Sequence, residues 1–192
     1  MRDLPETVVL LREFVRNPLR TGAVAPSGRG LADVLAGAVP AGGTVVELGP
    51  GTGAVTARIR RRRPARHVAV EINPRLARLV AARWPDVEVV CADAADLGAA
   101  VADGRADAVV SSLPWAVLPD ERQRATMRAV RDALSDGGCF TTYAYVHALR
   151  VPAARRLAAL LADTFADVSV SPVVWANVPP AVVYRARRPL GR

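Results

Sequence analysis

The chain has 192 residues, 51% of them apolar, which suits one domain with a sizeable core. No stretch reaches the ~18 uninterrupted apolar residues of a membrane-spanning helix. The first residues also lack the basic region and apolar run of a signal peptide. We therefore exclude an integral membrane protein, a collagen, a disulfide scaffold and a disordered tail, and expect a cytoplasmic protein.

The basic residues outnumber the acidic ones by 26 to 18, giving a net charge of +8, and all 26 are arginine. A basic surface attracts anionic partners such as lipid head groups or nucleic acid, without choosing between them. The two cysteines and two histidines do not have the spacing of metal ligands. The sequence therefore predicts reduced thiols and no metal site.

The first elements in chain order are two helices. Residues 4–17 place apolar side chains on one arc and charged ones opposite, which predicts an amphipathic helix that ends before Pro18. This helix either packs on the domain or contacts a membrane surface, and its mixed charges favour packing. A second helix is expected at 28–38. Residues 1–39 are interpreted as an N-terminal helical cover segment and residues 40–192 as the main domain, together one globular unit.

Short apolar runs of strand type then alternate with segments of helical period. This alternation, with continuously apolar strands, predicts a parallel sheet covered by helices on both faces. A short Asn-Val-Pro-Pro link joins the last two strands, so we expect an antiparallel pair at the sheet edge. Strands are predicted at 44–48, 67–71, 87–91, 106–110, 139–143, from 168 onward and at 181–184, and helices at 54–63, 74–84, 94–102, 120–135 and 152–165.

A glycine-rich turn, residues 46–53 (VELGPGTG), follows the first strand and opens a helix. It lacks the Gly-Lys-Ser/Thr element of a phosphate-binding P-loop. Glu71 ends the second strand, about 20 residues on, where it can accept hydrogen bonds from ribose hydroxyls. Asp93 ends the third strand, where it can accept from an adenine amino group. The alternatives are that Asp93 caps a helix and that Glu71 is solvated.

A glycine turn with acids and no phosphate grip fits an adenosine cofactor that carries an amino acid. Over residues 40–150 this pattern resembles the class I S-adenosylmethionine-dependent methyltransferases. The resemblance implies an α/β fold, a single-domain Rossmann-like sheet of seven mostly parallel strands, and S-adenosyl-L-methionine as cofactor. The cofactor-binding residues it implies are Glu47, Gly49, Pro50, Gly51, Thr52, Gly53, Glu71, Ile72, Asp93, Ala94 and Ser111.

Four further segments, 14–27, 70–74 with 83–85, 111–114 and 175–181, are similar to those of bacterial phospholipid N-methyltransferases. That resemblance implies methylation of the amine of phosphatidylethanolamine, or of a methylated derivative, by an enzyme peripheral to the inner face of the membrane. The substrate-binding residues expected from it are Arg20, Val24, Pro26, Ser27, Pro114, Tyr143 and Trp175.

The same family is similar to the rRNA adenine dimethylases, which carry Asn-Leu/Ile-Pro-Tyr/Phe where this chain has Ser112-Leu113-Pro114-Trp115. The Asn amide holds the exocyclic amine there, whereas Ser112 is shorter and has no carbonyl acceptor. Trp115 can still stack on a base. The difference argues against an RNA base, and no nucleic-acid partner is expected. The arginines of residues 58–66 are interpreted as a solvated charge run far from the site.

Tyr143 and Tyr145 share one face at the end of the fifth strand, and His147 follows. An ethanolamine amine must lose a proton before it attacks, so Tyr145 or His147 is the expected acceptor. Aromatic faces also favour a cationic product, although simple packing remains the alternative for these rings. The catalytic candidates are Tyr145, His147, Ser112 and Trp115. Two other functions stay open: methylation of a soluble small molecule, and cofactor binding without catalysis.

Overall fold

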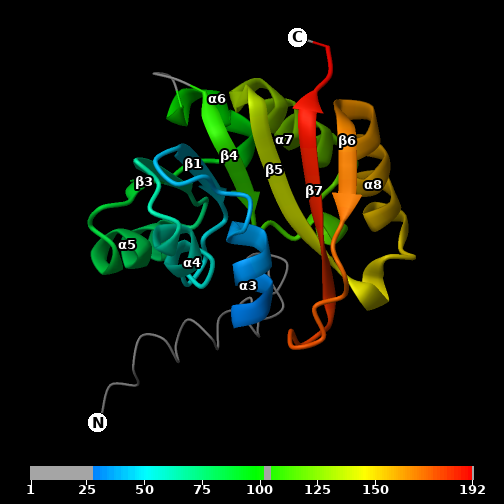
Figure 1. Ribbon diagram of the computed structural model, residues 1–192, viewed down its shortest axis with the longest axis horizontal. Helices are drawn as coiled ribbons and strands as arrows, with labels where there is room; N and C mark the ends of the chain where they lie inside the picture. Colours follow the sequence, from blue (N-terminus) through cyan, green and yellow to red (C-terminus); the bar gives the residue numbers. More distant parts are fainter. Residues whose placement is uncertain (1–27, 102–104, 192) are drawn as a thin grey trace.

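The computed structural model describes residues 28–101 and 105–191, which form one mixed sheet covered by helices (Figure 1). The sheet has seven strands in the order β3-β2-β1-β4-β5-β7-β6. This is the predicted α/β architecture. The strands are β1 (Thr44–Leu48), β2 (Arg66–Val70), β3 (Glu88–Val90), β4 (Ala106–Ser111), β5 (Leu134–Tyr145), β6 (Phe165–Val170) and β7 (Ala181–Pro189).

Strand directions agree with the predicted mostly parallel sheet. Strands β1 to β5 pair in parallel, whereas β7 pairs antiparallel with both β5 and β6. The expected antiparallel pair is confirmed, with β7 inside and β6 at the edge. The largest boundary differences from expectation are that β6 begins at Phe165, three residues early, β5 already begins at Leu134, and β7 continues to Pro189.

Helices cover both faces, as continuously apolar strands require. Core residues of α3, α4 and α5 pack on the face that includes Val45 and Ala69, and those of α6, α7 and α8 on the face that includes Val46 and Leu48. The α-helices are α3 (Arg29–Ala36), α4 (Thr56–Arg61), α5 (Pro74–Arg83), α6 (Leu97–Ala100), α7 (Asp120–Ala133) and α8 (Pro152–Thr164).

Three short 3₁₀ turns complete the connections: η1 (Ala94–Asp96), η2 (Trp115–Val117) and η3 (Val146–Ala148). The helix expected at 94–102 is therefore η1 followed by the single turn of α6. The helix expected at 28–38 is α3. The amphipathic helix expected at 4–17, and most of the cover segment 1–39, lie outside the described residues.

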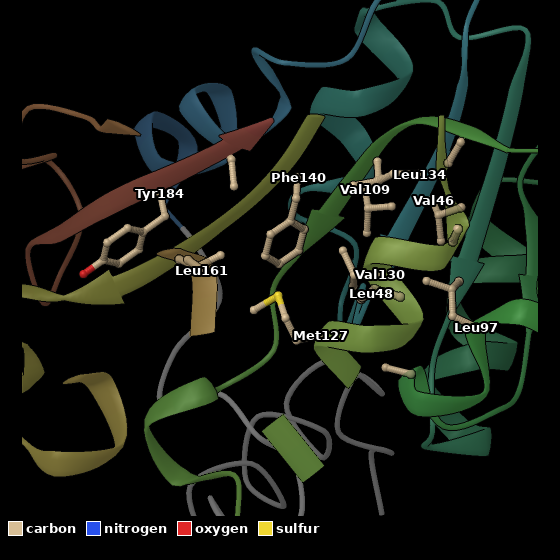
Figure 2. Close-up of a cluster of buried hydrophobic side chains, with 14 of the residues drawn as sticks. Val46, Leu48, Leu97, Val109, Met127, Val130, Leu134, Phe140, Leu161 and Tyr184 are labelled. Atoms are coloured by element: carbon tan, nitrogen blue, oxygen red, sulfur yellow. The ribbon is translucent and has the colours of Figure 1, made fainter. Parts of the chain in front are cut away.

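The larger core cluster centres on the ring of Phe140 (Figure 2). Phe140 meets the Trp115 ring edge-on at 6.2 Å between centroids and stacks on Phe165 at 6.1 Å. Trp115, Phe140 and Phe165 are fully buried. Such aromatic pairs add about 0.5–1.5 kcal/mol each beyond the area they bury. They tie η2, β5 and the start of β6 into one unit.

Because β1 to β5 are parallel, their carboxyl ends meet at one edge of the sheet, the lower edge in Figure 1. The loop that enters β7 lies at this edge too, since Ala181 pairs with Tyr145. We call it the carboxyl edge. In open α/β sheets ligands bind there. Among the described residues no helix is both long and apolar enough to cross a membrane.

Candidate active site

The glycine-rich turn leaves β1 at the carboxyl edge with positive φ at Gly49, Gly51 and Gly53 (70°, 57° and 83°). The amide of Gly49 donates to the carbonyl of Val70 at 2.9 Å, which joins the turn to the end of β2. A Cβ on Gly53 would lie 2.0 Å from the Trp84 ring. Only glycine fits there, because the left-handed backbone and the indole both exclude a side chain.

Glu71 joins this turn to the start of α5. Its Oε2 accepts from the Gly51 amide at 3.1 Å, and its Oε1 accepts from the Asn73 amide at 2.9 Å. The side chain is buried, so the solvated alternative is wrong. Burial raises the pKa of the carboxyl, with a smaller contribution from Glu47, and the two backbone hydrogen bonds partly offset this. Each oxygen keeps a lone pair for a further donor.

Glu47, at the last but one position of β1, pairs with His67 of β2. Oε2 of Glu47 lies 3.1 Å from Nε2 of His67, and both side chains are buried. Sequence reasoning missed His67. The available signal was register, since Val45 lies opposite His67 and Glu47 opposite Ala69, which puts both polar side chains on one face.

Asp93, after β3, caps η1 by accepting from the Ala95 amide at 3.0 Å. Its other oxygen forms an ion pair with Arg122 of α7, a partner that the sequence did not suggest. The capping alternative is therefore the arrangement observed. If Asp93 also accepted from an adenine amino group, its carboxylate would bind that group together with the Ala95 amide and Arg122.

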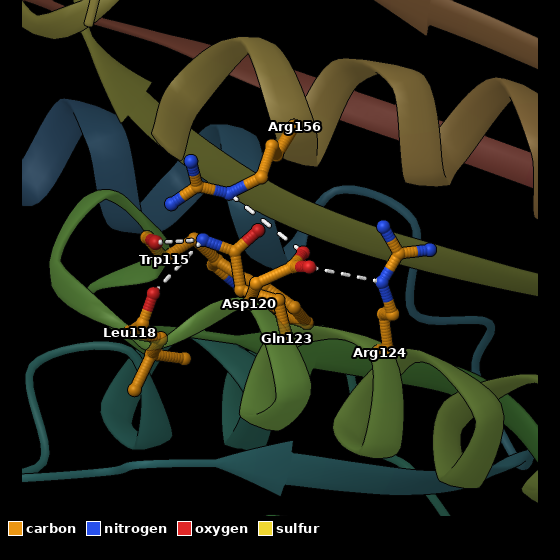
Figure 3. Close-up of polar contacts among 6 residues, drawn as sticks. All are labelled: Trp115, Leu118, Asp120, Gln123, Arg124 and Arg156. Carbon is orange, nitrogen blue, oxygen red and sulfur yellow. Dashed lines mark hydrogen bonds and ion pairs between the residues drawn. The ribbon is translucent and has the colours of Figure 1, made fainter. Parts of the chain in front are cut away.

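Trp115 does not reach the surface. Its Nε1 donates to Oγ of Ser111 at 3.1 Å, and its ring is 1% exposed. This corrects the expected stacking role, because a buried ring offers no face to a substrate. Gln123 holds η2 on α7 by donating to the carbonyls of Trp115 at 2.7 Å and Leu118 at 3.2 Å (Figure 3).

Next to Trp115 lie two other predicted site residues, Ser112 and Pro114. The Ser112 amide donates to the Leu48 carbonyl at 2.8 Å. Its hydroxyl oxygen is buried and has no hydrogen-bond partner among the described residues. Pro114 is half-buried. A buried hydroxyl without a partner costs free energy unless a ligand satisfies it, so Ser112 remains a candidate.

Three rings line the end of β5. Tyr143 and Tyr145 meet edge-on at 5.3 Å between centroids, and Tyr145 stacks on His147 at 5.6 Å with 14° between the planes. Tyr143 is buried, which with the neighbouring Tyr145 raises the pKa of its phenol far above the usual range. Tyr145 is half-buried and His147 exposed. Exposure therefore increases along the series toward the carboxyl edge.

The loop between β6 and β7 presents Trp175 to solvent, with 73% of the side chain exposed. Asn177 two residues later is buried and accepts from the Gly28 amide at 2.8 Å. It also donates to the Pro179 carbonyl at 2.6 Å. Asn177, which was not among the predicted site residues, therefore joins the start of α3 to this loop. The predicted substrate residues Arg20, Val24, Pro26 and Ser27 lie outside the described residues.

The turn and its neighbours fit a nucleoside cofactor that carries an amino acid. The glycines put no side chain over the backbone of the turn, Glu71 supplies carboxylate lone pairs, and Ile72 presents an apolar side chain 57% exposed. Oε1 of Glu47 is buried without a partner among the described residues. The remaining predicted cofactor residues cluster here: Pro50 and Ala94 are buried, and Thr52 is half-buried.

Three arginines, two in α4 and one at the start of β2, form ion pairs away from the carboxyl edge. Arg58 lies 3.2 Å from Asp33, Arg60 2.8 Å from Asp86, and Arg66 2.8 Å from Glu88. Hydrogen bonds from Arg60 and Arg66 lower the pKa of the Asp86 and Glu88 carboxyls. Half of the arginines of residues 58–66 are thus paired, and Arg61, Arg62 and Arg63 are exposed, all of them away from the site. No group of three or more His, Cys, Asp or Glu within residues 28–101 and 105–191 could hold a metal ion.

Comparisons with known proteins identify the family of the chain. A family model described as a methyltransferase domain matches residues 45–138. An ornithine lipid N-methyltransferase from Singulisphaera acidiphila is 32% identical over 142 residues, 69% of this chain and 74% of that protein. A probable ribosomal RNA small subunit methyltransferase A from Pyrobaculum aerophilum is 34% identical over 109 residues, 56% of this chain and 41% of that protein.

The fold has solved counterparts. The crystal structure of Aeropyrum pernix fibrillarin with natively bound S-adenosyl-L-methionine matches with a TM-score of 0.62 and 20% identity. The match covers 81% of this chain and 73% of that one. At this identity the likeness concerns the fold alone.

Proposed function

Because this chain belongs to the S-adenosylmethionine-dependent methyltransferases, we propose that it methylates the amine of a lipid head group at a membrane surface. Phosphatidylethanolamine or a methylated derivative is the first candidate acceptor. The observation that carries the lipid substrate is the 32% identity with an ornithine lipid N-methyltransferase, which spans 74% of that protein. An ornithine head group also offers a primary amine, so it is the second acceptor to test.

The bound cofactor supplies an electrophilic methyl group on a sulfonium. The residues that would hold it are the backbone of Gly49 to Gly53, the Glu71 carboxylate and the apolar side chain of Ile72. Glu71 accepts from the ribose hydroxyls in this proposal, and Oε1 of Glu47, which has no partner among the described residues, is a further acceptor. Their role is to position the methyl group for in-line attack, which is the main requirement of this chemistry.

The acceptor amine enters beside the end of β5. A lipid amine is mostly protonated at neutral pH, so it attacks only after it loses a proton. In this proposal Tyr145 or the stacked His147 takes that proton, directly or through water, and the Ser112 hydroxyl accepts a hydrogen bond from the amine. Methylation leaves a cation, which the exposed aromatic faces stabilise by about 0.5–2 kcal/mol per contact.

The burial of Trp115 supports a lipid rather than a nucleic-acid acceptor. In the adenine dimethylases that this chain resembles, the aromatic residue at this position stacks on the base. Here the indole ring packs on Phe140 and donates to Ser111. The ring is therefore not available to a flipped adenine.

Methyl transfer from radiolabelled S-adenosylmethionine tests the proposal. The acceptors are vesicles with phosphatidylethanolamine, vesicles with ornithine lipid, total RNA and a soluble cell extract. We expect label in the lipid phase, with chromatography giving the number of methyl groups, and none with a Glu71→Ala variant. Label in RNA or only in soluble metabolites overturns the lipid assignment while leaving the cofactor site intact. No label in any acceptor, with the cofactor still bound, favours the non-catalytic alternative.

A further inference from the structure

Exposed large apolar side chains gather at the carboxyl edge. Of the eight such residues in the described chain, five follow strand ends there or precede β7, and they are Ile72, Val117, Val151, Trp175 and Val178. We call these five the apolar rim. They come from four separate loops, after β2, β4 and β5 and before β7. Four loops that are distant in sequence therefore present apolar groups around one site.

Four of the five side chains in the apolar rim are more than half exposed. Val178 is 81% exposed, Trp175 73%, and Val117 53%. Scattered apolar residues are normal on a surface, but a group gathered around a binding site marks an interaction surface. Tryptophan is also enriched at membrane–water interfaces, because its amphipathic ring lies at the level of the lipid head groups.

Charge at the same edge fits an anionic partner. Arg29 opens α3 and Arg150 follows η3, and both side chains are exposed. Two acids at this edge are paired, Asp120 with Arg124 and Arg156 and Asp93 with Arg122, while Asp96 and Glu121 are exposed. Arg75, exposed at the start of α5, brings the arginines here to six against these four acids, so the balance at this edge is basic. Basic residues beside apolar ones bind anionic lipid surfaces.

We propose that the apolar rim, with Arg29 and Arg150, is a docking surface for a bilayer containing anionic phospholipid. Docking by this edge would face the glycine turn, Glu71 and the β5 aromatic residues toward the lipid. A head group would then reach the site without its acyl chains leaving the membrane. The proposal rests on the proposed lipid substrate, because that substrate is the reason for the enzyme to dock on a bilayer. Docking itself can be measured without methyl transfer.

Flotation with vesicles of phosphatidylcholine, with and without phosphatidylglycerol, tests docking in the full chain. We expect binding to require phosphatidylglycerol, and to fall about tenfold in Val117→Ser/Val178→Ser and about tenfold in Arg150→Glu. The matched control is Val168→Ser/Leu190→Ser, which removes exposed apolar groups from β6 and from the opposite edge. The control should float like the unsubstituted protein. An equal loss of vesicle binding in the control and rim variants overturns the proposal, and so does the absence of binding to either vesicle. Binding that is insensitive to salt and survives in all variants also overturns it.

Turnover on a short-chain phosphatidylethanolamine dispersed as monomers separates this proposal from the lipid-substrate proposal. We expect Val117→Ser/Val178→Ser to keep its rate on monomers and lose about tenfold on vesicles. Loss on both substrates overturns docking by the rim. Flotation without methylation of any lipid keeps the docking surface and rejects the lipid substrate. Methylation of monomers without flotation keeps the lipid substrate and rejects the docking surface.

Discussion

The carboxylate of Glu47 and the imidazole of His67 form a buried pair directly beneath the glycine turn, with 3.1 Å between Oε2 and Nε2. Oε1 of Glu47 and Nδ1 of His67 have no partner among the described residues. Each group is therefore the sole visible partner of the other. A charged group in such a place is costly when unpaired, so removing either partner destabilises the other.

We expect His67→Phe to lower the free energy of unfolding by roughly 3–5 kcal/mol, because it leaves the buried Glu47 carboxylate without a partner. Glu47→Gln should cost much less, since an amide oxygen can still accept from His67. Urea unfolding of the two variants at neutral pH measures both values. A His67→Phe protein as stable as the unsubstituted one would show that the pair contributes nothing.

Glu71 should make cofactor binding depend on pH. Burial raises the pKa of its carboxyl above 4.5, so the protonated form stabilises the folded apo-protein below that value. This contribution is lost as the pH rises through the folded-state pKa. Ribose hydroxyls need the carboxylate, so affinity for S-adenosylhomocysteine should rise over the same interval. Calorimetric titration at acidic and neutral pH measures this.

The matched variant Glu71→Gln should bind about 10–100-fold more weakly at neutral pH, because hydrogen bonds to a charged acceptor are worth about 1.5–3 kcal/mol. Its affinity should also be flat with pH across that interval. A Gln variant with the affinity and pH dependence of the unsubstituted protein would remove Glu71 from the cofactor site.

Gly53→Ala should destabilise the protein and weaken cofactor binding. The new Cβ would lie 2.0 Å from the Trp84 ring at a φ of 83°. Strain and overpacking together suggest a loss of about 2–5 kcal/mol. Gly98→Ala is the control, because that position lies in α6, has open space and should gain up to ~1 kcal/mol. Thermal unfolding of both variants measures the difference in stability. Similar unfolding midpoints for the two would mean that the turn tolerates a side chain.

Replacing both Tyr145 and His147 with phenylalanine should lower kcat by about 10²-fold or more, because the variant keeps the stacked rings and loses both proton acceptors. Tyr143→Phe on the same strand is the control. Burial raises the pKa of the Tyr143 phenol, so it stays protonated and should not take a proton. Steady-state rates on lipid vesicles measure the effect. Unchanged turnover in the double variant would discard both residues as proton acceptors.

The sequence predicted the fold well because its strand signals are local. The five parallel strands are short apolar runs, and their carboxyl ends bring Glu71 to the glycine turn by topology alone. The boundary of β5 was missed because residues 134–138 (LSDGG) carry no alternation, although Leu134 pairs with Ala106. Such a boundary depends on the neighbouring strand rather than on local propensity.

The site was harder to predict, because its details depend on contacts between distant residues. The sequence predicted that Trp115 could stack on a substrate, but its ring packs on Phe140 and donates to the Ser111 hydroxyl in the core. The pairing of Asp93 with Arg122 depends on where α7 begins. Periodicity along one segment carries no information on either contact.

The position of β7 has a consequence for synthesis on the ribosome. Strand β6 has β7 as its only partner in the described sheet, and β7 also covers the outer edge of β5. Both edges stay unpaired until residues 181–189 emerge. Unpaired strand edges recruit other chains. A nascent chain arrested between α8 and β7 should therefore be the species most dependent on chaperones, and completing nine residues of strand should end that dependence.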